Sequence, residues 1–387
     1  MSSKPPFVRL GELVRPSRQK NKNGDVTAVY SVTNSRGFVP SEDYFSKEVF
    51  SKELRTYRIV ERGSIAYNPS RINVGSIALQ DKEDKVIVSP LYVVFSVDGQ
   101  CALPEYVVRF LKSKPGLDQI AGQSIGTVRS NLKLDALCRL ELRLPSLAEQ
   151  EQMLAILRSI EREIEGAQRI LKKLDSLAKS RFVEMFGDPV DGALWPRKQL
   201  RDIYHVKSSK RIYANEQVKS GVPFYRLADI GTLIDGATPK SGLYISEGKF
   251  EELKARGQVP RPDDILVTAR GTLGRCYVIK GGDRFYFQDG MITWLGQTDA
   301  TPLPTYLLSV FSNGHFSEWL NANCSGTTVR YLSINDLGKA SIPVPPLETQ
   351  REFAAFAAQV DKSESIARKQ IEKLQMLYDS LAQEYFG

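Results

Sequence analysis

The sequence predicts an α+β fold: two globular α/β domains separated by an antiparallel pair of long helices, with a pseudo-two-fold internal repeat. Three observations predict this fold. Two long helical patterns carry the apolar spacing of a coiled coil, the second pattern repeats the first at an offset of 200 residues, and the segments that join helix to domain are short.

The first long helical pattern runs from Ala148 to Phe186. Its apolar positions recur in alternating steps of four and three residues, which is the 3.5-residue repeat of a coiled coil. These positions are Met153, Leu157, Ile160, Ile164, Ala167, Leu171, Leu174 and Ala178. At about 1.5 Å per residue, such a helix would reach roughly 58 Å. A seam of that length needs a partner helix of similar length.

The partner is the same pattern 200 residues later, where only Ile164 loses its apolar counterpart and becomes Glu364. Both copies end on Phe-Gly, at Phe186-Gly187 and Phe386-Gly387. Between residues 103–187 and 303–387, 19 of 85 positions are identical. Unrelated sequences of background composition would share about five. A repeat of this length indicates a duplicated unit of domain plus helix.

Short connections determine the predicted direction of the helices. About ten residues, including the breaker cluster Asp188–Gly192, separate Phe186 from the second globular domain. The second helix leaves that domain directly through Pro345, so it must run back along the first to bury its seam. We therefore predict domains at 1–145 and 188–345, helices at 146–187 and 346–387, and Gly387 close to the first domain.

Within each domain, short apolar runs separated by polar turns predict strands. In the first domain we expect strands at 27–32, 64–67, 77–79, 86–88 and 92–95, and a helix from Pro104 to Lys112. In the second domain, the strand at 265–268 and its following turn correspond to the segment from Gly63 to Arg71.

The composition is that of a protein with hydrophobic cores and a net positive charge. Of its 387 residues, 42% are hydrophobic, and the net charge is +8. A basic balance makes a polyanionic partner plausible without proving one. No run of 18 apolar residues predicts a membrane span, and the N-terminus lacks an apolar signal core. Four cysteines without C-x-x-C spacing fit reduced thiols and a cytoplasmic location.

The sequence offers little material for catalysis. It contains two histidines, His205 and His315, and no nucleotide-binding glycine motif. The segment Tyr67–Ser70 is faintly similar to the N-P-P-aromatic loop of adenine methyltransferases, but it lacks the second proline and the aromatic residue. A strand-ending turn with its backbone fixed by proline is the favoured interpretation. We predict no catalytic residue and no metal ligand.

Polar and basic turns near the strand ends are the candidate DNA contacts. Arginine can bridge guanine, asparagine can bridge adenine, and flanking lysines and arginines can hold phosphates. In the first domain the candidates are Asn34, Ser35, Arg36, Tyr67, Asn68, Ser70, Arg71 and Asn73. In the second they are Lys207, Lys210, Arg211, Tyr225, Arg226, Thr268, Arg270, Thr272, Arg275 and Arg330. Arg330 is a weaker candidate, as are Arg129 and Asn131 in the matching loop of the first domain. For each, a solvated surface role is the alternative.

The paired segments around Gly126-Thr127 and Leu144–Gln150, and around Gly326–Thr328 and Val344–Gln350, resemble the specificity subunit of type I restriction–modification systems. Asp264–Leu266, Arg270-Gly271 and both long helices extend the resemblance over the whole chain. In the first domain, Ser70-Arg71-Ile72 stands where the second has Arg-Gly.

The resemblance implies a non-catalytic subunit with two target-recognition domains, each reading half of a bipartite, asymmetric site on double-stranded DNA. It also implies that the helical pair spaces the half-sites and docks two methyltransferase subunits and restriction subunits. S-adenosylmethionine would be bound by the methyltransferase, and this chain would need no cofactor. Two other classes remain open: a methyltransferase fused to its own reader, and a coiled-coil adaptor or DNA-binding protein acting outside a restriction system.

Overall fold

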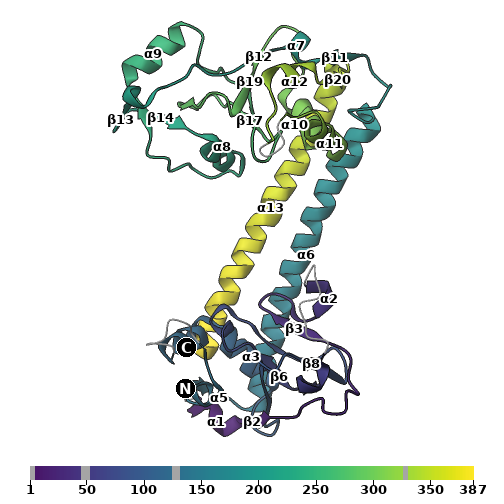
Figure 1. Cartoon of the computed structure of the whole chain (residues 1–387), viewed down its shortest axis with the longest axis vertical. Coiled ribbons are helices and arrows are strands. Elements are labelled where there is room, and N and C mark those ends of the chain that lie inside the picture. Colours follow the sequence, from purple (N-terminus) through teal and green to yellow (C-terminus); the bar gives the residue numbers. More distant parts are fainter. Residues whose placement is uncertain (1–4, 45–52, 124–130, 326–329) are drawn as a thin grey trace. The chain divides into compact units, whose positions relative to one another are not determined.

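The computed structural model describes residues 5–44, 53–123, 131–325 and 330–387, and the chain forms two compact units (Figure 1). Unit 1 comprises Met1–Arg169 and Arg368–Gly387, and unit 2 comprises Ile170–Ala367. The division falls inside both long helices, α6 (Leu147–Phe186) and α13 (Leu347–Phe386), each of 40 residues. Each unit therefore contains part of both helices.

Unit 1 is built on an antiparallel sheet with strand order β2-β9-β6-β7. Its strands are β2 (Val14–Ser17), β6 (Ile65–Tyr67), β7 (Ile77–Leu79) and β9 (Val93–Val97). Three antiparallel pairs flank the sheet: β1 (Phe7–Arg9) with β10 (Glu141–Arg143), β3 (Tyr30–Thr33) with β4 (Gly37–Pro40), and β5 (Arg58–Glu61) with β8 (Lys85–Val88).

Short helices complete unit 1. They are α1 (Leu10–Leu13), α2 (Ser41–Tyr44), η1 (Leu54–Thr56), η2 (Ile72–Val74), α3 (Pro104–Lys112), α4 (Lys114–Gln123) and α5 (Leu134–Leu137). Pro104 occupies the first turn of α3, where a missing N–H costs nothing because that donor has no partner inside the helix.

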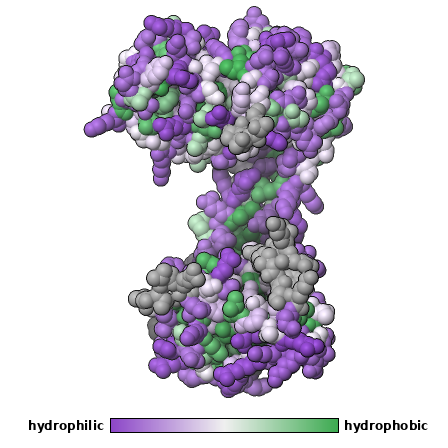
Figure 2. All heavy atoms as spheres, in the orientation of Figure 1, coloured by the Kyte–Doolittle hydropathy of each residue, from purple (hydrophilic) through white to green (hydrophobic). Residues whose placement is uncertain are grey.

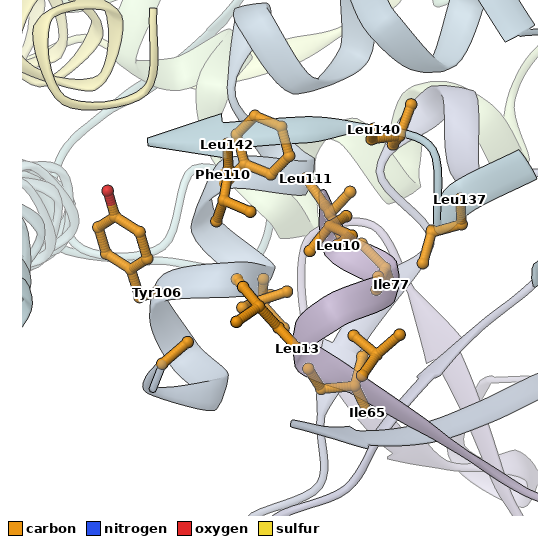
Figure 3. Packing of buried hydrophobic residues seen from close by; sticks show 14 of the residues in the cluster. Leu10, Leu13, Ile65, Ile77, Tyr106, Phe110, Leu111, Leu137, Leu140 and Leu142 are labelled. Atoms are coloured by element: carbon orange, nitrogen blue, oxygen red, sulfur yellow. The ribbon is translucent and has the colours of Figure 1, made fainter. Parts of the chain in front are cut away.

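The main core of unit 1 joins the sheet to α1, η2, α3, α4 and α5 (Figure 3). Ile65 and Tyr67 of β6 face this core, together with Tyr106 and Phe110 of α3. The other face of β6 is buried as well, because Ala66 belongs to a second cluster beneath β3, β4 and β8. Strand β6 is therefore covered on both faces, and the chain reaches solvent in the loops at its two ends.

Unit 2 repeats this plan with the strand order β12-β19-β16-β17, again antiparallel. These strands are β12 (Tyr204–Lys207), β16 (Ile265–Thr268), β17 (Cys276–Val278) and β19 (Ile292–Gln297). A second sheet contains β13 (Gln217–Val218), β15 (Tyr244–Ile245), β14 (Val222–Tyr225) and β18 (Tyr286–Phe287). Strands β11 (Arg197–Gln199) and β20 (Ser341–Pro343) form a separate pair.

The helices of unit 2 are α7 (Leu200–Ile203), η3 (Ala214–Glu216), α8 (Leu227–Ile234), α9 (Glu247–Ala255), α10 (Pro304–Ser312), α11 (Gly314–Ala322) and α12 (Ile334–Lys339). Its main core packs Ile265 and Val267 of β16 against α10 and α11. Leu266, on the other face of β16, lies in a separate cluster with Trp294.

The two long helices pack antiparallel, as the sequence predicts. In unit 1, Leu154 and Leu157 of α6 share a core with Ala382 and Phe386, near the end of α13. In unit 2, Phe182 and Phe186 pack instead against Phe353, near the start of α13, with ring centroids 5.6 and 5.3 Å from that of Phe353. The beginning of each helix thus meets the end of the other.

The predicted place of the last residue is also confirmed within unit 1. The Arg143 Nε donates a hydrogen bond of 2.6 Å to the backbone carbonyl of Gly387. Most predicted strands occur within one or two residues of their expected bounds, although β3 begins at Tyr30 rather than at Thr27. Among the described residues, none of the helices has the length and apolarity that a bilayer crossing demands. The four cysteines are free.

Candidate nucleic-acid interface

In unit 1, three polar segments come together where β6 ends. The turn after β3 (Asn34–Arg36) is exposed and lies beside the loop after β6, because the Ser76 hydroxyl donates a hydrogen bond of 2.8 Å to the carbonyl of Val32. The segment at Leu132 joins them through its backbone N–H, which donates to the carbonyl of Pro69 at 3.0 Å. Candidates separated by almost 100 residues in sequence are thus neighbours in space.

The loop after β6 is shaped by its own side chains. The Asn68 carboxamide oxygen accepts hydrogen bonds from the backbone N–H and the hydroxyl of Ser70, at 3.1 and 2.9 Å. This Asx-type turn leaves Arg71 and Asn73 exposed on the loop, next to Ser70. Asn68 is half-buried. Its carboxamide stabilises the turn, and part of its side chain lies at the surface.

Unit 2 places the corresponding loop, residues 269–275, in the same way. The Leu332 N–H donates to the carbonyl of Ala269 at 2.9 Å, which is the same bond as Leu132 to Pro69, 200 residues further on. Arg270 pairs with Tyr331 as an isolated β-bridge. Thr272 and Arg330 are exposed there, and Arg330 directly precedes the bridge residue.

Residues 208–211 and α8 border this loop in unit 2. Ala269 donates its N–H to the carbonyl of Met291, and the N–H of the adjacent Gly290 donates to the Ser208 hydroxyl, so the basic segment around Lys210 follows the same end of the sheet. On the side of α8, the Arg275 guanidinium pairs with Asp235. Arg226, the N-terminal cap of α8, is exposed, while Tyr225 beside it packs against Phe285.

Two of the predicted contact residues have buried side chains. Tyr67 has no exposed surface, and its hydroxyl donates to the carbonyl of Leu132 at 3.0 Å; burial raises the pKa of this phenol. Thr268 is 3% exposed, and its hydroxyl donates to the carbonyl of Thr272. Both residues end a strand that is covered on both faces, so they shape the following loop instead of presenting a side chain to a ligand.

Three of the predicted cations already interact with other side chains of the protein. Arg211 pairs with Asp289 at 2.9 Å, Arg275 pairs with Asp235, and the Lys207 ammonium lies 3.6 Å from the centre of the Trp294 ring. The exposed ion pairs are worth little in water, so a phosphate could compete for either arginine. Arg129 and the Gly-Thr segments at 126–127 and 326–327 lie outside the described residues.

The structure adds residues that sequence patterns did not single out. Tyr331, which follows Arg330 and forms the bridge to Arg270, is 40% exposed, and an exposed aromatic ring can stack on a base. Leu91 is 78% exposed in the turn before β9, which leaves the same end of the sheet as the loop after β6. Its exposure comes from the turn geometry at Pro90, which an apolar-pattern search cannot detect.

The two units thus present one backbone frame with unlike side chains. The sequence profile of the type I restriction modification DNA specificity domain matches residues 7–175 and again 193–376. The chain belongs to this family. The interpretation as a non-catalytic specificity subunit with a duplicated architecture is therefore confirmed, and neither an adaptor nor a fused methyltransferase is favoured.

Known members of the family agree with this assignment. The specificity chain is 31% identical over 188 residues to a putative type I restriction enzyme specificity subunit, S.HindORF215P, from Haemophilus influenzae. That match spans about half of each protein, 48% of this chain and 45% of the relative.

Two solved structures share the fold over nearly the full length of both chains. One, from a study of complex assembly and conformational transition of a type I R-M system, gives a TM-score of 0.63 at 19% identity and covers 100% of this chain and 98% of its own. The other, a type I restriction-modification S subunit from M. genitalium, gives 0.55 at 15% identity, with 100% and 97% covered.

Proposed function

We propose that this specificity chain reads a bipartite, asymmetric site on double-stranded DNA, with one target-recognition domain, 1–145 or 188–345, for each half-site. The observation that carries the proposal is the repeated loop after β6 and β16. The same backbone hydrogen bond fixes it against the segment at 131–132 or 331–332 in each unit. A common frame with different exposed side chains suits two recognition surfaces of different sequence preference.

In each domain, the exposed loop residues would enter the major groove and the surrounding cations would hold phosphates. The candidate readers in unit 1 are the exposed Asn34, Arg36, Arg71 and Asn73. In unit 2 they are the exposed Arg226 and Thr272 and the half-buried Arg270. The remaining exposed candidates, Ser35, Ser70, Lys210 and Arg330, surround them. This division follows from exposure and from the segments that each loop adjoins.

We further propose that the long helices dock two methyltransferase subunits and, where the system contains them, restriction subunits. The methyltransferase would supply S-adenosylmethionine and extrude the target adenine, since a base inside the duplex is out of reach of an enzyme. The specificity chain would then need no cofactor of its own. Such a complex would act in the cytoplasm, where the chromosome of a bacterium or archaeon lies.

Co-expression with a candidate methyltransferase gene of the same genome, followed by long-read methylation mapping, tests the proposal. We expect a complex with two methyltransferase subunits per specificity chain and one bipartite methylated motif. Arg270→Ala should weaken methylation or relax one half of the motif, whereas Arg284→Ala, which removes an exposed ion pair with Glu247 outside the loop, should leave the motif unchanged. A stable complex that methylates no defined motif would overturn the proposal.

A further inference from the structure

We infer that unit 2 holds a phosphate-binding pocket at the end of its sheet opposite to the recognition loop. The pocket has a volume of about 290 Å³ and lies among β12, the end of β19 and the segment between α9 and β16. His205 and Lys207 line it from β12, and Arg261 lines it from the segment before β16. Three side chains that can donate to an anion thus converge on one hollow.

The one acidic side chain in the lining keeps its negative charge, but it is buried and is held in place by hydrogen bonds. Asp264 is 3% exposed and accepts three hydrogen bonds: from the Trp294 indole at 2.9 Å, and from the backbone N–H groups of Gln297 and Arg261 at 3.0 and 2.8 Å. Its charge is therefore spread over fixed donors inside the protein. Lys207 and Arg261 are therefore the charged side chains of the lining that remain accessible to an anion.

Lys207 is positioned more firmly than a surface lysine usually is. Its ammonium lies 3.6 Å from the centre of the Trp294 ring, and Trp294 is itself fixed by the bond to Asp264. Burial against this ring lowers the pKa of Lys207, and a bound anion would relieve that cost. The indole thus acts as a platform that holds the ammonium at the pocket.

The remaining walls are compatible with a phosphate. The C-terminal turn of α9 approaches at Gly257, and helix C-termini repel anions. Here the carbonyls of Glu252, Leu253 and Lys254 are capped by the N–H groups of Arg256, Gln258 and Gly257. His205 can donate one ring N–H even when neutral, and the guanidinium of Arg261 is exposed and suited to two phosphate oxygens.

The ligand class is a phosphate ester, and the source most consistent with the proposed function, on which this part of the inference rests, is the DNA backbone. β12 pairs with β19 from Tyr204–Gln297 to Lys207–Trp294, so the pocket adjoins the start of β16 whereas the recognition loop follows its end. A phosphate held here would be a second anchor for unit 2, separate from the residues that read bases.

The test measures the salt dependence of duplex binding by the full chain, in complex with its methyltransferase if the chain alone binds weakly. Each phosphate contact contributes about 0.9 to the slope of log K against log salt. We expect Lys207→Met and Arg261→Ala each to reduce that slope by about 1, uniformly across DNA sequences. Lys254→Met and Arg256→Ala, two cations of the same unit that do not line the pocket, serve as matched controls and should keep the slope.

A parallel titration with inorganic phosphate, followed by Trp294 fluorescence against a Trp294→Phe blank, identifies the source of the ligand. Unchanged slopes with saturable phosphate binding that Lys207→Met abolishes would assign the pocket to a free phosphorylated ligand and overturn the DNA anchor. Unchanged slopes without phosphate binding would overturn the pocket altogether. If the chain and its complex bind no duplex, the proposed function fails, while lysine-dependent phosphate binding would still support the pocket.

Discussion

Gly63 and Asp263 occupy equivalent positions in the two copies and share one backbone conformation with different chemistry. Their φ angles are 87° and 69°, and Asp263 is the one non-glycine residue with positive φ among the described residues. Glycine adopts this region freely, and aspartate tolerates it better than most residues. The second copy thus shows that the turn before the central strand accepts an aspartate.

This equivalence predicts how Gly63 responds to substitution. A Cβ at Gly63 would meet no atom within 4 Å, so any cost is conformational. We expect Gly63→Asp to change the free energy of unfolding by less than ~1 kcal/mol, and Gly63→Val to lower it by ~1–2 kcal/mol. Urea denaturation of both variants measures the difference. Equal losses for aspartate and valine would contradict the conformational explanation.

His315 gives unit 2 a pH-dependent contact. The Asp188 carboxylate accepts a hydrogen bond from its Nδ1 at 3.1 Å, while Asp191 lies 3.6 Å from Nε2. The hydrogen bond to Asp188, with the nearby charges of Asp191 and Glu318, raises the pKa of His315 above its usual 6.5. Because the folded-state pKa is raised, the stabilisation is complete below about pH 6.5 and is lost as the pH rises through the folded-state value.

We therefore expect His315→Gln to lower the thermal midpoint more at pH 6 than at pH 9. Thermal unfolding followed by circular dichroism at both pH values tests this. Asp191→Asn, which removes the more distant partner, should produce a smaller change of the same sign. A deficit that is the same at pH 6 and pH 9 would show that protonation of His315 does not contribute.

At the scale of elements, a buried glutamine fixes each domain to the start of its long helix. The Gln150 carboxamide oxygen accepts the N–H of Leu103 at 2.8 Å, and its NH₂ group donates to the carbonyl of Pro145 at 2.9 Å. Gln350 makes the same two bonds in unit 2, at 2.7 and 2.8 Å. Each glutamine thus satisfies these two backbone groups where the chain enters the helix, and Gln150 also donates to the carbonyl of Cys101 at 3.1 Å.

Gln150→Leu should lower the free energy of unfolding by about 1–3 kcal/mol, because it leaves the backbone N–H of Leu103 without its acceptor. Gln152→Leu changes an exposed residue of the same helical turn and should have little effect. Chemical denaturation of both variants provides the comparison. Equal losses in the free energy of unfolding for Gln150→Leu and Gln152→Leu would contradict this role of Gln150.

Sequence periodicity predicted the long helices, whose buried positions recur at a regular spacing. It did not predict which side chains of a short strand are buried, because that depends on what packs against each face of the strand. Of the eight predicted seam residues of α6, Leu157, Ile160 and Ala167 are buried, and the other five are half-buried. The burial of Tyr67 was not predicted, because β6 packs against one core through Ile65 and against another through Ala66. Alternation within a three-residue strand cannot reveal two such cores. The loop after the strand, however, lies where the turn residues indicated.

Long-range ion pairs were equally invisible in the sequence. In unit 1, Arg109 of α3 donates to Glu161 of α6 at 2.8 Å and to the Tyr378 hydroxyl of α13 at 2.9 Å. Its counterpart 200 residues later is Ser309, which instead bonds within its own helix. A pair search limited to neighbouring turns of one helix finds neither partner, because the contacts exist only after α3 packs on both long helices.

At the scale of the whole molecule, the repeated hydrogen bonds of the two units indicate that each recognition domain can be exchanged as a module. Replacing residues 1–145 by the corresponding domain of another family member keeps Gln150. Its two partners, the N–H at position 103 and the carbonyl at position 145, are backbone groups that the incoming domain also supplies. We expect the hybrid, co-expressed with its methyltransferase, to methylate a motif in which one half is new and the other is unchanged. Long-read methylation mapping of the hybrid and the parent provides the measurement. The exchange leaves residues 188–345 unchanged. If both halves of the motif were altered, the two domains would not recognise their half-sites independently.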